Sequence, residues 1–307
     1  MSETVLFTDG PDAASLLTEA RERVDALLVA WAERIQTIVP GRTGEALAYA
    51  LKTPGKRVRA ALLMAAYRAA GGHSPAIAAV AAAIETVHTY SLVHDDLPCM
   101  DDDSVRRGRP TTHRAFDVPT ATRVGFLLVP VAALVLSQAA RDLVLPAETL
   151  GRMAAELFRS GGIEGMVGGQ WLDLEAEGRT LDLEGLKAVH RGKTGALIRG
   201  ACVIGALAAE APAQTIEALQ RYGDEVGLAF QIADDVLDVT ATTAQLGKSA
   251  GKDAAHDKST YVSVMGVDQA RAEAGGLTAQ AIGNLERAGV PSSALGALAH
   301  YIITRES

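Results

Sequence analysis

The sequence predicts an all-α fold, a large bundle of helices. Apolar residues make up 48% of the chain, only 4% of residues are aromatic, and alternating β-branched runs are few. This alanine-rich composition is typical of a helical core. Apolar residues also recur every three or four positions, which is the period of amphipathic helices. Because no repeat, low-complexity linker or change in composition divides the 307 residues, we expect one domain over 1–307, with 1–12 loosely attached.

Proline and glycine divide this pattern into separate helices, because both residues interrupt helical structure. The first amphipathic helix is expected at residues 13–38 and ends at Pro40-Gly41. The other expected helices are 44–52, a segment from about Arg59 to 70, 77 to just past Asp95, 119–141, 147–176, 182–190, 194–209, 213–239, 267–288 and 292–304. Residues 240–262, which contain Thr, Gly and Lys, are expected to form a functional loop.

The overall charge and the cysteines restrict the class of protein. A net charge of -8 argues against general nucleic-acid binding. Cys99 and Cys202 give neither a disulfide framework nor a metal-binding spacing. The N-terminus lacks a basic region followed by an apolar run, so we expect no signal peptide and a cytoplasmic enzyme. The uncharged stretch 124–140 is short for a membrane span. We therefore expect a core or subunit-interface helix there and no stable membrane insertion.

A dense acidic segment lies at the end of the helix that begins near residue 77. Five carboxylates fall within nine residues, and three arginines follow them: Asp95, Asp96, Asp101, Asp102, Asp103, Arg106, Arg107 and Arg109. Carboxylates packed this closely repel one another unless a cation bridges them, and oxygen-only ligands beside phosphate sites favour Mg²⁺. His88 shares a helical face with Asp95, and Pro98 ends the helix just past the acid pair. We expect the chain to double back there, so that Asp95 and Asp101 reach one metal ion.

A second acidic segment makes the first much more specific. Gln231, Asp234, Asp235 and Asp238 fall at i, i+3, i+4 and i+7, which is one face of a helix. Two aspartate-rich helix ends, far apart in the sequence, are expected to form two walls of one cavity. Several Mg²⁺ ions would lie between these walls, around a diphosphate.

These paired motifs resemble those of the trans-prenyl diphosphate synthases. DDLPCMD, residues 95–101, is similar to the family's first aspartate-rich motif, and DDVLD, 234–238, to its second. The resemblance extends from about residue 45 to residue 305. It implies the isoprenoid synthase fold, helices around a deep central cavity, and three Mg²⁺ ions per active site. It also implies a homodimer that condenses isopentenyl diphosphate with an allylic diphosphate, dimethylallyl or geranyl, to a linear trans-prenyl diphosphate.

The resemblance also implies roles for individual residues. Asp95, Asp101 and Asp234 would be the leading metal ligands, with support from Asp96, Asp102, Asp235 and Asp238. The isopentenyl diphosphate site would consist of Gly55, Lys56, Arg59, His88 and Arg107, with Arg106 facing the allylic diphosphate. Lys193, Lys248 and Lys258 would add positive charge there, Thr194 and Gln231 would stabilise the carbocation, and Gln170 and Asp173 would line the cavity. His94 and His113 are expected to be structural.

Some features depart from the family pattern or leave alternatives open. Many bacterial members have Gly-Asp where this chain has Gly125-Phe126, on a helix that borders the hydrocarbon pocket in the family. The usual Gly, Pro and Pro are replaced by Pro54, Ala60 and Val262. The five glycines of residues 160–174 indicate either close packing or close approach of substrate.

Product length is predicted from residues one to two helical turns before Asp95. An isoprene unit adds roughly 4 to 5 Å, close to one turn of about 5.4 Å. Tyr90 and Ser91 lie five and four residues before Asp95, so the Tyr90 side chain is expected to be the floor of the cavity and to limit the product to C15. Phe126 is a second candidate, which would shorten the product to C10 or open the pocket to C20. A C20 synthase, a terpene cyclase of the same fold and a non-catalytic synthase subunit remain as alternatives.

Overall fold

The computed structural model describes residues 11–176, 178–240 and 259–305. The helices in this part of the chain are α1 (Ala13–Ile38), α2 (Arg42–Leu51), α3 (Val58–Ala69), α4 (Ile77–Asp95), α5 (Thr112–Ala115), α6 (Val118–Asp142), α7 (Ala147–Gly161), α8 (Met166–Glu175), α9 (Leu183–His190), η1 (Arg191–Gly195), α10 (Ala196–Ala208), α11 (Ala213–Thr240), α14 (Tyr261–Met265), α15 (Val267–Arg287) and α16 (Ser293–Thr304). The two strands β1 (Val105–Arg106) and β2 (Arg109–Pro110) form a small antiparallel hairpin. The all-α prediction is confirmed.

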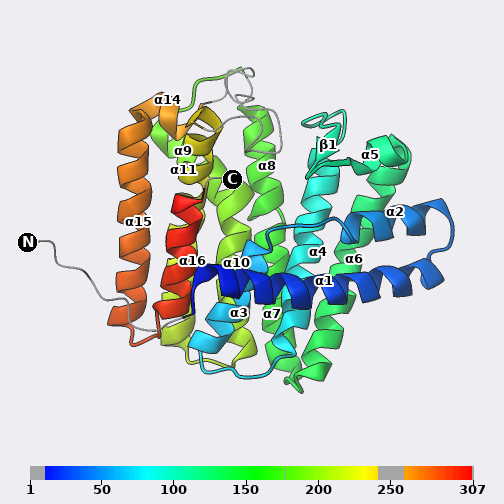
Figure 1. Cartoon of the computed structure of the whole chain (residues 1–307), viewed down its shortest axis with the longest axis horizontal. Helices are drawn as coiled ribbons and strands as arrows, with labels where there is room; N and C mark the ends of the chain where they lie inside the picture. The colour runs from blue at the N-terminus through cyan, green and yellow to red at the C-terminus, as the bar shows by residue number, and fades with distance from the viewer. Residues whose placement is uncertain (1–10, 177, 241–258, 306–307) are drawn as a thin grey trace, which may run out of the picture.

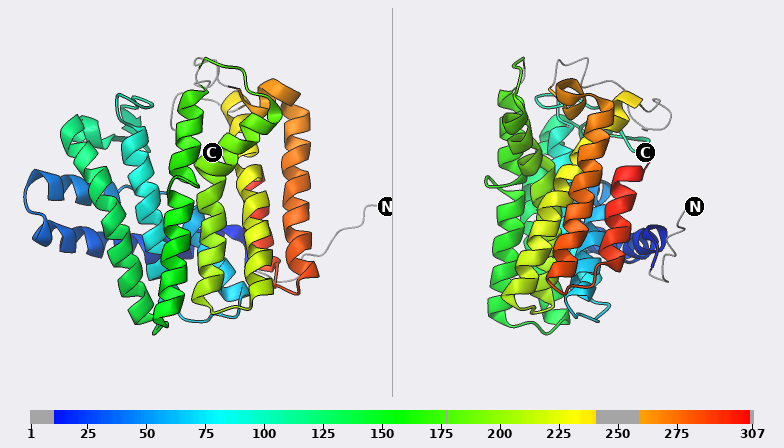
Figure 2. Two further views of the ribbon diagram at one scale, coloured as in Figure 1. Left: turned by 180° about the vertical axis from the view of Figure 1, so that it is seen from behind. Right: turned by 90° about the vertical axis from the view of Figure 1, so that its left-hand side faces the viewer.

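Most of the long helices run side by side, and α1 crosses them almost at right angles (Figure 1). Figure 2 shows α1 end-on in its right panel, on the side of the bundle opposite to α7 and α8. Helices α4 and α10 are apolar on nearly every side and bury most of their residues, as a helix without a polar face must. The main apolar core extends from Leu16 on α1 to Ile302 on α16.

Helix ends follow local capping rules. The Asp12 carboxylate accepts a hydrogen bond from the Ser15 amide at 2.7 Å and so caps α1. Asp117 caps α6 in the same way, by accepting from the Thr120 amide at 2.7 Å, and Pro119 stands in the first turn. Most of the expected helices begin and end within two residues of the predicted limits.

Two expected limits are wrong. The helix expected at 147–176 is two helices, α7 and α8, because the chain turns at 162–165. There Gly165 lies so close to the Ser160 carbonyl that an added Cβ would come within 2.2 Å of its oxygen. The break expected between 190 and 194 is absent, because the π-helical turn η1 joins α9 to α10. The loop expected at 240–262 ends in helix α14, and its residues 241–258 lie outside the described part of the chain.

Helix α6 contains the uncharged stretch noted in the sequence. Within the described ranges it is the one helix long and apolar enough to cross a membrane, and 50% of its most apolar window is buried inside the bundle. Its buried face includes Val124, Leu128 and Leu136 and packs against α4. Burial against α4 accounts for the apolar residues on that side of the helix.

Candidate active site

The first acidic segment folds back on itself just after α4. The Asp101 amide donates a hydrogen bond to the Asp95 carbonyl at 2.8 Å, so the chain reverses beyond Pro98 as expected. Asp102 completes the reversal in the left-handed region, with φ of 45°. Burial raises the pKa of Asp95 to about 7 against the opposing attraction of Lys193, and the nearby Asp101 carboxylate adds to the rise. Asp95 is thus a partly buried carboxylate whose negative charge the nearby cations of the protein do not fully offset.

The second acidic segment lies on α11 and is joined to η1 by a chain of hydrogen bonds. The Thr194 hydroxyl donates to Gln231 Oε1 at 2.8 Å, and Gln231 Nε2 donates to Asp235 Oδ1 at 3.1 Å. The other oxygen of Asp235 accepts from the Tyr261 amide at 2.8 Å. Asp235 is therefore buried and occupied with fixing α14, whereas Asp234 and Asp238 remain partly exposed on α11.

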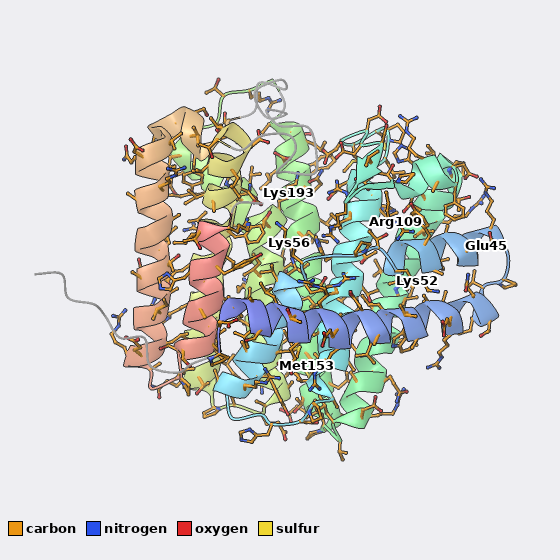
Figure 3. All side chains as sticks on the ribbon, in the orientation of Figure 1. Glu45, Lys52, Lys56, Arg109, Met153 and Lys193 are labelled. Carbon is orange, nitrogen blue, oxygen red and sulfur yellow. The ribbon has the colours of Figure 1, made fainter. Side chains whose placement is uncertain are left out.

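Lys193 projects from the π-helical turn η1, a type of turn often found at functional sites. Its Nζ lies 2.7 Å from Asp173 Oδ2 on α8. Burial alone would lower the pKa of Lys193, but Asp173, Asp101 and Asp95 outweigh it and raise the pKa, so the ammonium stays charged. Figure 3 labels Lys193 near the middle of the bundle. A Cβ at Gly169 would lie 1.9 Å from the Lys193 backbone nitrogen, so this glycine serves close helix packing.

A basic cluster lies against α4 one to two turns before Asp95. Arg59 NH1 lies 3.3 Å from His88 Nε2. Burial, followed by the charges of Arg59 and Arg107, holds the pKa of His88 well below its ordinary value, so the ring is neutral and accepts from Arg59. Arg107 donates to the Pro54 carbonyl at 2.6 Å. A Cβ at Gly55 would lie 2.6 Å from Arg107 NH1, so a larger residue there would displace this guanidinium group.

A cavity of about 420 Å³, a size within the usual range for ligand pockets, is bordered by Asp95, by Lys193 and Thr194 of η1, and by Arg59 and His88 of the basic cluster. Arg107 lines a smaller cavity instead, and the acids of α11 are not among the lining residues. Charged and polar residues line one part: Arg59, His88, Ser91, Asp95, Gln170, Lys193 and Thr194. Aromatic and apolar residues line the rest, together with one histidine: Tyr90, Leu92, His94, Met100, Met166, Val167, Trp171 and Leu174. The Gln170 amide is buried and has no hydrogen-bond partner among the described residues, which indicates a place for a polar ligand.

Several predicted site residues lie elsewhere. Arg106 pairs with Asp96 at 2.6 Å and with Asp103 at 3.3 Å, beside a separate cavity of about 30 Å³. Asp96 is held by that arginine and does not line the main cavity, and the expectation that Arg106 faces the allylic diphosphate stays a prediction. Asp102 lies 3.6 Å from Arg114. Exposed Lys56 is on the chain before α3, and Lys248 and Lys258 lie outside the described residues.

Phe126 also does not occupy the expected place. Its side chain is 70% exposed on α6 and does not line the main cavity. The neighbouring Gly125 is the residue that faces inward, toward α4. Phe126 therefore lies outside the pocket and does not form its floor.

Two arginines that the sequence reasoning passed over are part of the site's support. Arg57, 4% exposed, pairs with Asp25 at 2.7 Å and with Glu85 at 3.1 Å, and so fixes the start of α3 against α1 and α4. The sequence does contain a signal for the Arg57 pair, because Glu85 is an acid on an otherwise apolar stretch of α4 and needs a cationic partner. Arg305 pairs with Asp234 at 2.5 Å and stacks on Phe230 at 4.1 Å. No sequence spacing connects Arg305 to a site 71 residues away.

Comparison with known proteins agrees with this geometry. A family model described as polyprenyl synthetase matches residues 41–290. The chain belongs to this family. It is 43% identical over 265 residues to a farnesyl diphosphate synthase of Escherichia coli, covering 85% of this chain and 88% of that protein. It is 40% identical to the large subunit of a heterodimeric geranylgeranyl pyrophosphate synthase of Arabidopsis thaliana, covering 87% and 73%.

A solved structure supports the same assignment. The Helicobacter pylori geranyltransferase complexed with magnesium and isoprenyl diphosphate has a TM-score of 0.80 and 30% identity. The match covers 97% of this chain and 97% of that one. This polyprenyl synthetase is therefore a prenyltransferase with the isoprenoid synthase fold.

Proposed function

We propose that this polyprenyl synthetase makes farnesyl diphosphate, a C15 product, from isopentenyl diphosphate and dimethylallyl or geranyl diphosphate. The observation that carries the proposal is the cavity in which Asp95 and Lys193 lie at the polar part and Tyr90 and His94 border the apolar part. The farnesyl diphosphate synthases among the relatives agree with it.

The carboxylates fit Mg²⁺ bound together with a diphosphate. Asp95 is the last residue of α4, Asp101 lies in the turn after it, and Asp234 and Asp238 lie on α11. In the described residues no three acidic, histidine or cysteine side chains converge on one point. Mg²⁺ commonly takes one or two carboxylates, substrate phosphate oxygens and waters, so fewer protein ligands per ion are expected. We propose three ions per active site, which neutralise the leaving diphosphate when bound.

The protein's own groups position the reaction. The C1–O bond of the allylic substrate breaks, and the electron pair leaves with the diphosphate, beside the Lys193 ammonium. The isopentenyl double bond then attacks C1, forming the new carbon–carbon bond and moving the positive charge to the isopentenyl unit. Loss of a proton to the released diphosphate completes the reaction. The hydrogen-bonded pair Thr194 and Gln231 stabilises the carbocation, and the apolar wall excludes water from it.

The second substrate is held by the basic cluster. Arg59 and Arg107 bind the diphosphate of isopentenyl diphosphate, because guanidinium groups meet phosphate oxygens in pairs. Neutral His88 orients Arg59 through the contact at 3.3 Å. Lys56 would add charge at the mouth of this cluster.

We further propose a cytoplasmic homodimer. Exposed apolar side chains outside the main cavity lie on and between α6, α7 and α8: Val118, Phe126, Leu134, Phe158, Ile163 and Leu172. Helices α7 and α8 lie on the side of the bundle opposite to α1 (Figure 2). Exposed apolar patches mark interaction surfaces, and a second copy of the chain is the proposed occupant. Sedimentation of an active monomer would rule it out.

One assay separates the proposed function from its alternatives. The purified protein is incubated with Mg²⁺, isopentenyl diphosphate and, in turn, C5, C10 and C15 allylic diphosphates, and the products are identified by mass. We expect C15 diphosphate from the C5 and C10 substrates. A C20 product would indicate a geranylgeranyl synthase, and a cyclic hydrocarbon made without isopentenyl diphosphate would indicate a cyclase. Product only after a second subunit is added would indicate a non-catalytic partner.

A further inference from the structure

Three aromatic rings run in series from the cavity to the outer surface of the bundle. Tyr90 and His94, one helical turn apart on α4, make an edge contact with centroids 5.0 Å apart and planes at 64°. His94 in turn makes an edge contact with Phe126 of α6, at 6.1 Å and 86°. Tyr90 and His94 line the cavity, whereas Phe126 is exposed. His94 therefore stands between the proposed floor residue and α6.

The His94 ring is fixed against α6 because residue 125 has no side chain. A Cβ built on Gly125 would lie 1.8 Å from His94 Nε2 and 2.2 Å from Cδ2. His94 Nε2 also lies 3.3 Å from the Thr122 carbonyl oxygen, one turn earlier on α6. The imidazole thus occupies the space that any larger residue at position 125 would fill, and it cannot move further toward α6.

The direction of the side chains places His94 behind Tyr90. A helical side chain leans toward the N-terminus of its helix and covers the turn before its own Cα, and residues four apart are face neighbours. The His94 ring consequently contacts the Tyr90 ring on one side and the backbone of α6 at Gly125 on the other. With His94 in that position, Tyr90 cannot turn aside for a longer hydrocarbon chain.

We propose that His94, seated on Gly125, is a specificity-determining residue that holds Tyr90 in place and so sets product length. The cavity floor is then a pair of rings backed by a helix, rather than Tyr90 alone. This inference rests on the proposed synthesis of a linear C15 diphosphate. It makes opposite predictions for two substitutions at one contact, which a general loss of stability would not produce.

The first half of the test removes the backing ring. In His94→Ala, Tyr90 gains room toward α6, so the ratio of C20 to C15 product should rise at least about tenfold, a typical discrimination for a small change in an apolar pocket. The same variant should elongate farnesyl diphosphate supplied as the allylic substrate, which is a gain of activity. His94→Phe keeps a ring in the same place and should restore mainly C15. His300→Ala, a change at an exposed histidine of α16, is the matched control and should leave the product distribution unchanged.

The second half of the test moves the His94 ring in the opposite direction, toward Tyr90. In Gly125→Ala the new methyl group displaces His94 toward Tyr90 and the cavity, so C10 should accumulate and C15 should fall. Gly275→Ala is its control, because that helical glycine has no atom within 4 Å of an added Cβ. If Gly125→Ala does not fold, the two His94 variants still decide the question.

The outcomes separate this inference from the proposed function. Product shifts are measured relative to wild type by mass, in variants whose thermal unfolding shows that they are folded. Failure of the wild-type protein to make any linear diphosphate would remove the proposed function itself. Linear product from wild type with no lengthening in His94→Ala, or the same direction of change in His94→Ala and Gly125→Ala, would overturn the role of His94 alone.

Discussion

The two acidic segments differ in how the rest of the molecule holds them. The first is organised locally, because Asp101 bonds back to Asp95 across six residues and Arg106 pairs with Asp96 ten residues away. The second depends on distant parts of the chain: Asp234 contacts Arg305, and Asp235 accepts from Tyr261 at the start of α14. The turn after α4 is therefore built by its own sequence, whereas the acids of α11 are held by α14 and by the end of the described chain at Arg305.

The largest expected effect comes from removing one carboxylate from either wall. Asp95→Ala and Asp234→Ala should each lower turnover by about a thousandfold, because each removes several kcal/mol of stabilisation of the leaving diphosphate. Circular dichroism should show both variants folded. Asp142→Ala, at an exposed acid on α6, is the control and should retain wild-type turnover. Wild-type rates in a folded Asp95→Ala would refute the metal assignment.

The buried ion pair between Arg57 and Glu85 is expected to contribute strongly to stability. Arg57→Ala leaves Glu85 buried without its partner, so it should lower the free energy of unfolding by about 3 to 5 kcal/mol. Arg42→Ala breaks an exposed pair with Asp117 and should cost about 0 to 1 kcal/mol. Urea unfolding of the two variants checks the difference. Equal losses would show that the Arg57 network is not a structural anchor of α3 and α4.

The sequence predicted the fold and the main polar groups because these follow from local patterns. Helical periodicity located most helices, and Pro98 correctly marked the reversal that brings Asp101 back to Asp95. Only the family resemblance, and no local pattern, ranked Asp95 above its neighbour Asp96. In the structure Asp95 lines the cavity, whereas Arg106 holds Asp96. The break between α7 and α8 was missed because glycines there fit both a packed helix and a turn. Arg305 was missed because its contact depends on the tertiary fold.

In the metal-free protein, the free energy of unfolding should depend on pH through Asp95 of the first acidic segment. Asp95 has a pKa of about 7 in the folded state, against an ordinary value of 3.8. The unfolded chain therefore loses this proton first, and stability should fall as the pH rises from about 4 to 7. Asp95→Asn cannot titrate and should lack this component. Thermal unfolding across that range, in chelator, would contradict the account if the two proteins changed in parallel.

The smallest expected effect concerns the ion pair between Arg305 and Asp234 of the second acidic segment. Arg305 neutralises Asp234 and so competes with a metal ion for it. The Arg305 side chain is only 4% exposed, but Asp234 is 44% exposed, so solvent screens the pair. Arg305→Gln should therefore lower the Mg²⁺ concentration for half-maximal activity only a few-fold. Arg221→Gln, at an exposed pair on the same helix α11, serves as the control. A higher Mg²⁺ requirement in Arg305→Gln would show that Arg305 organises Asp234 rather than competing for it.

The most direct test of the account is whether both walls bind one metal–diphosphate group. Calorimetry measures Mg²⁺ binding in the presence of inorganic diphosphate for wild type, Asp95→Ala, Asp234→Ala and the double variant. If the walls share one site, each single substitution should remove nearly all of the diphosphate-dependent binding, and the double variant should be no worse than either. Losses that are partial in each single variant and additive in the double variant would mean two independent sites and would contradict the central claim.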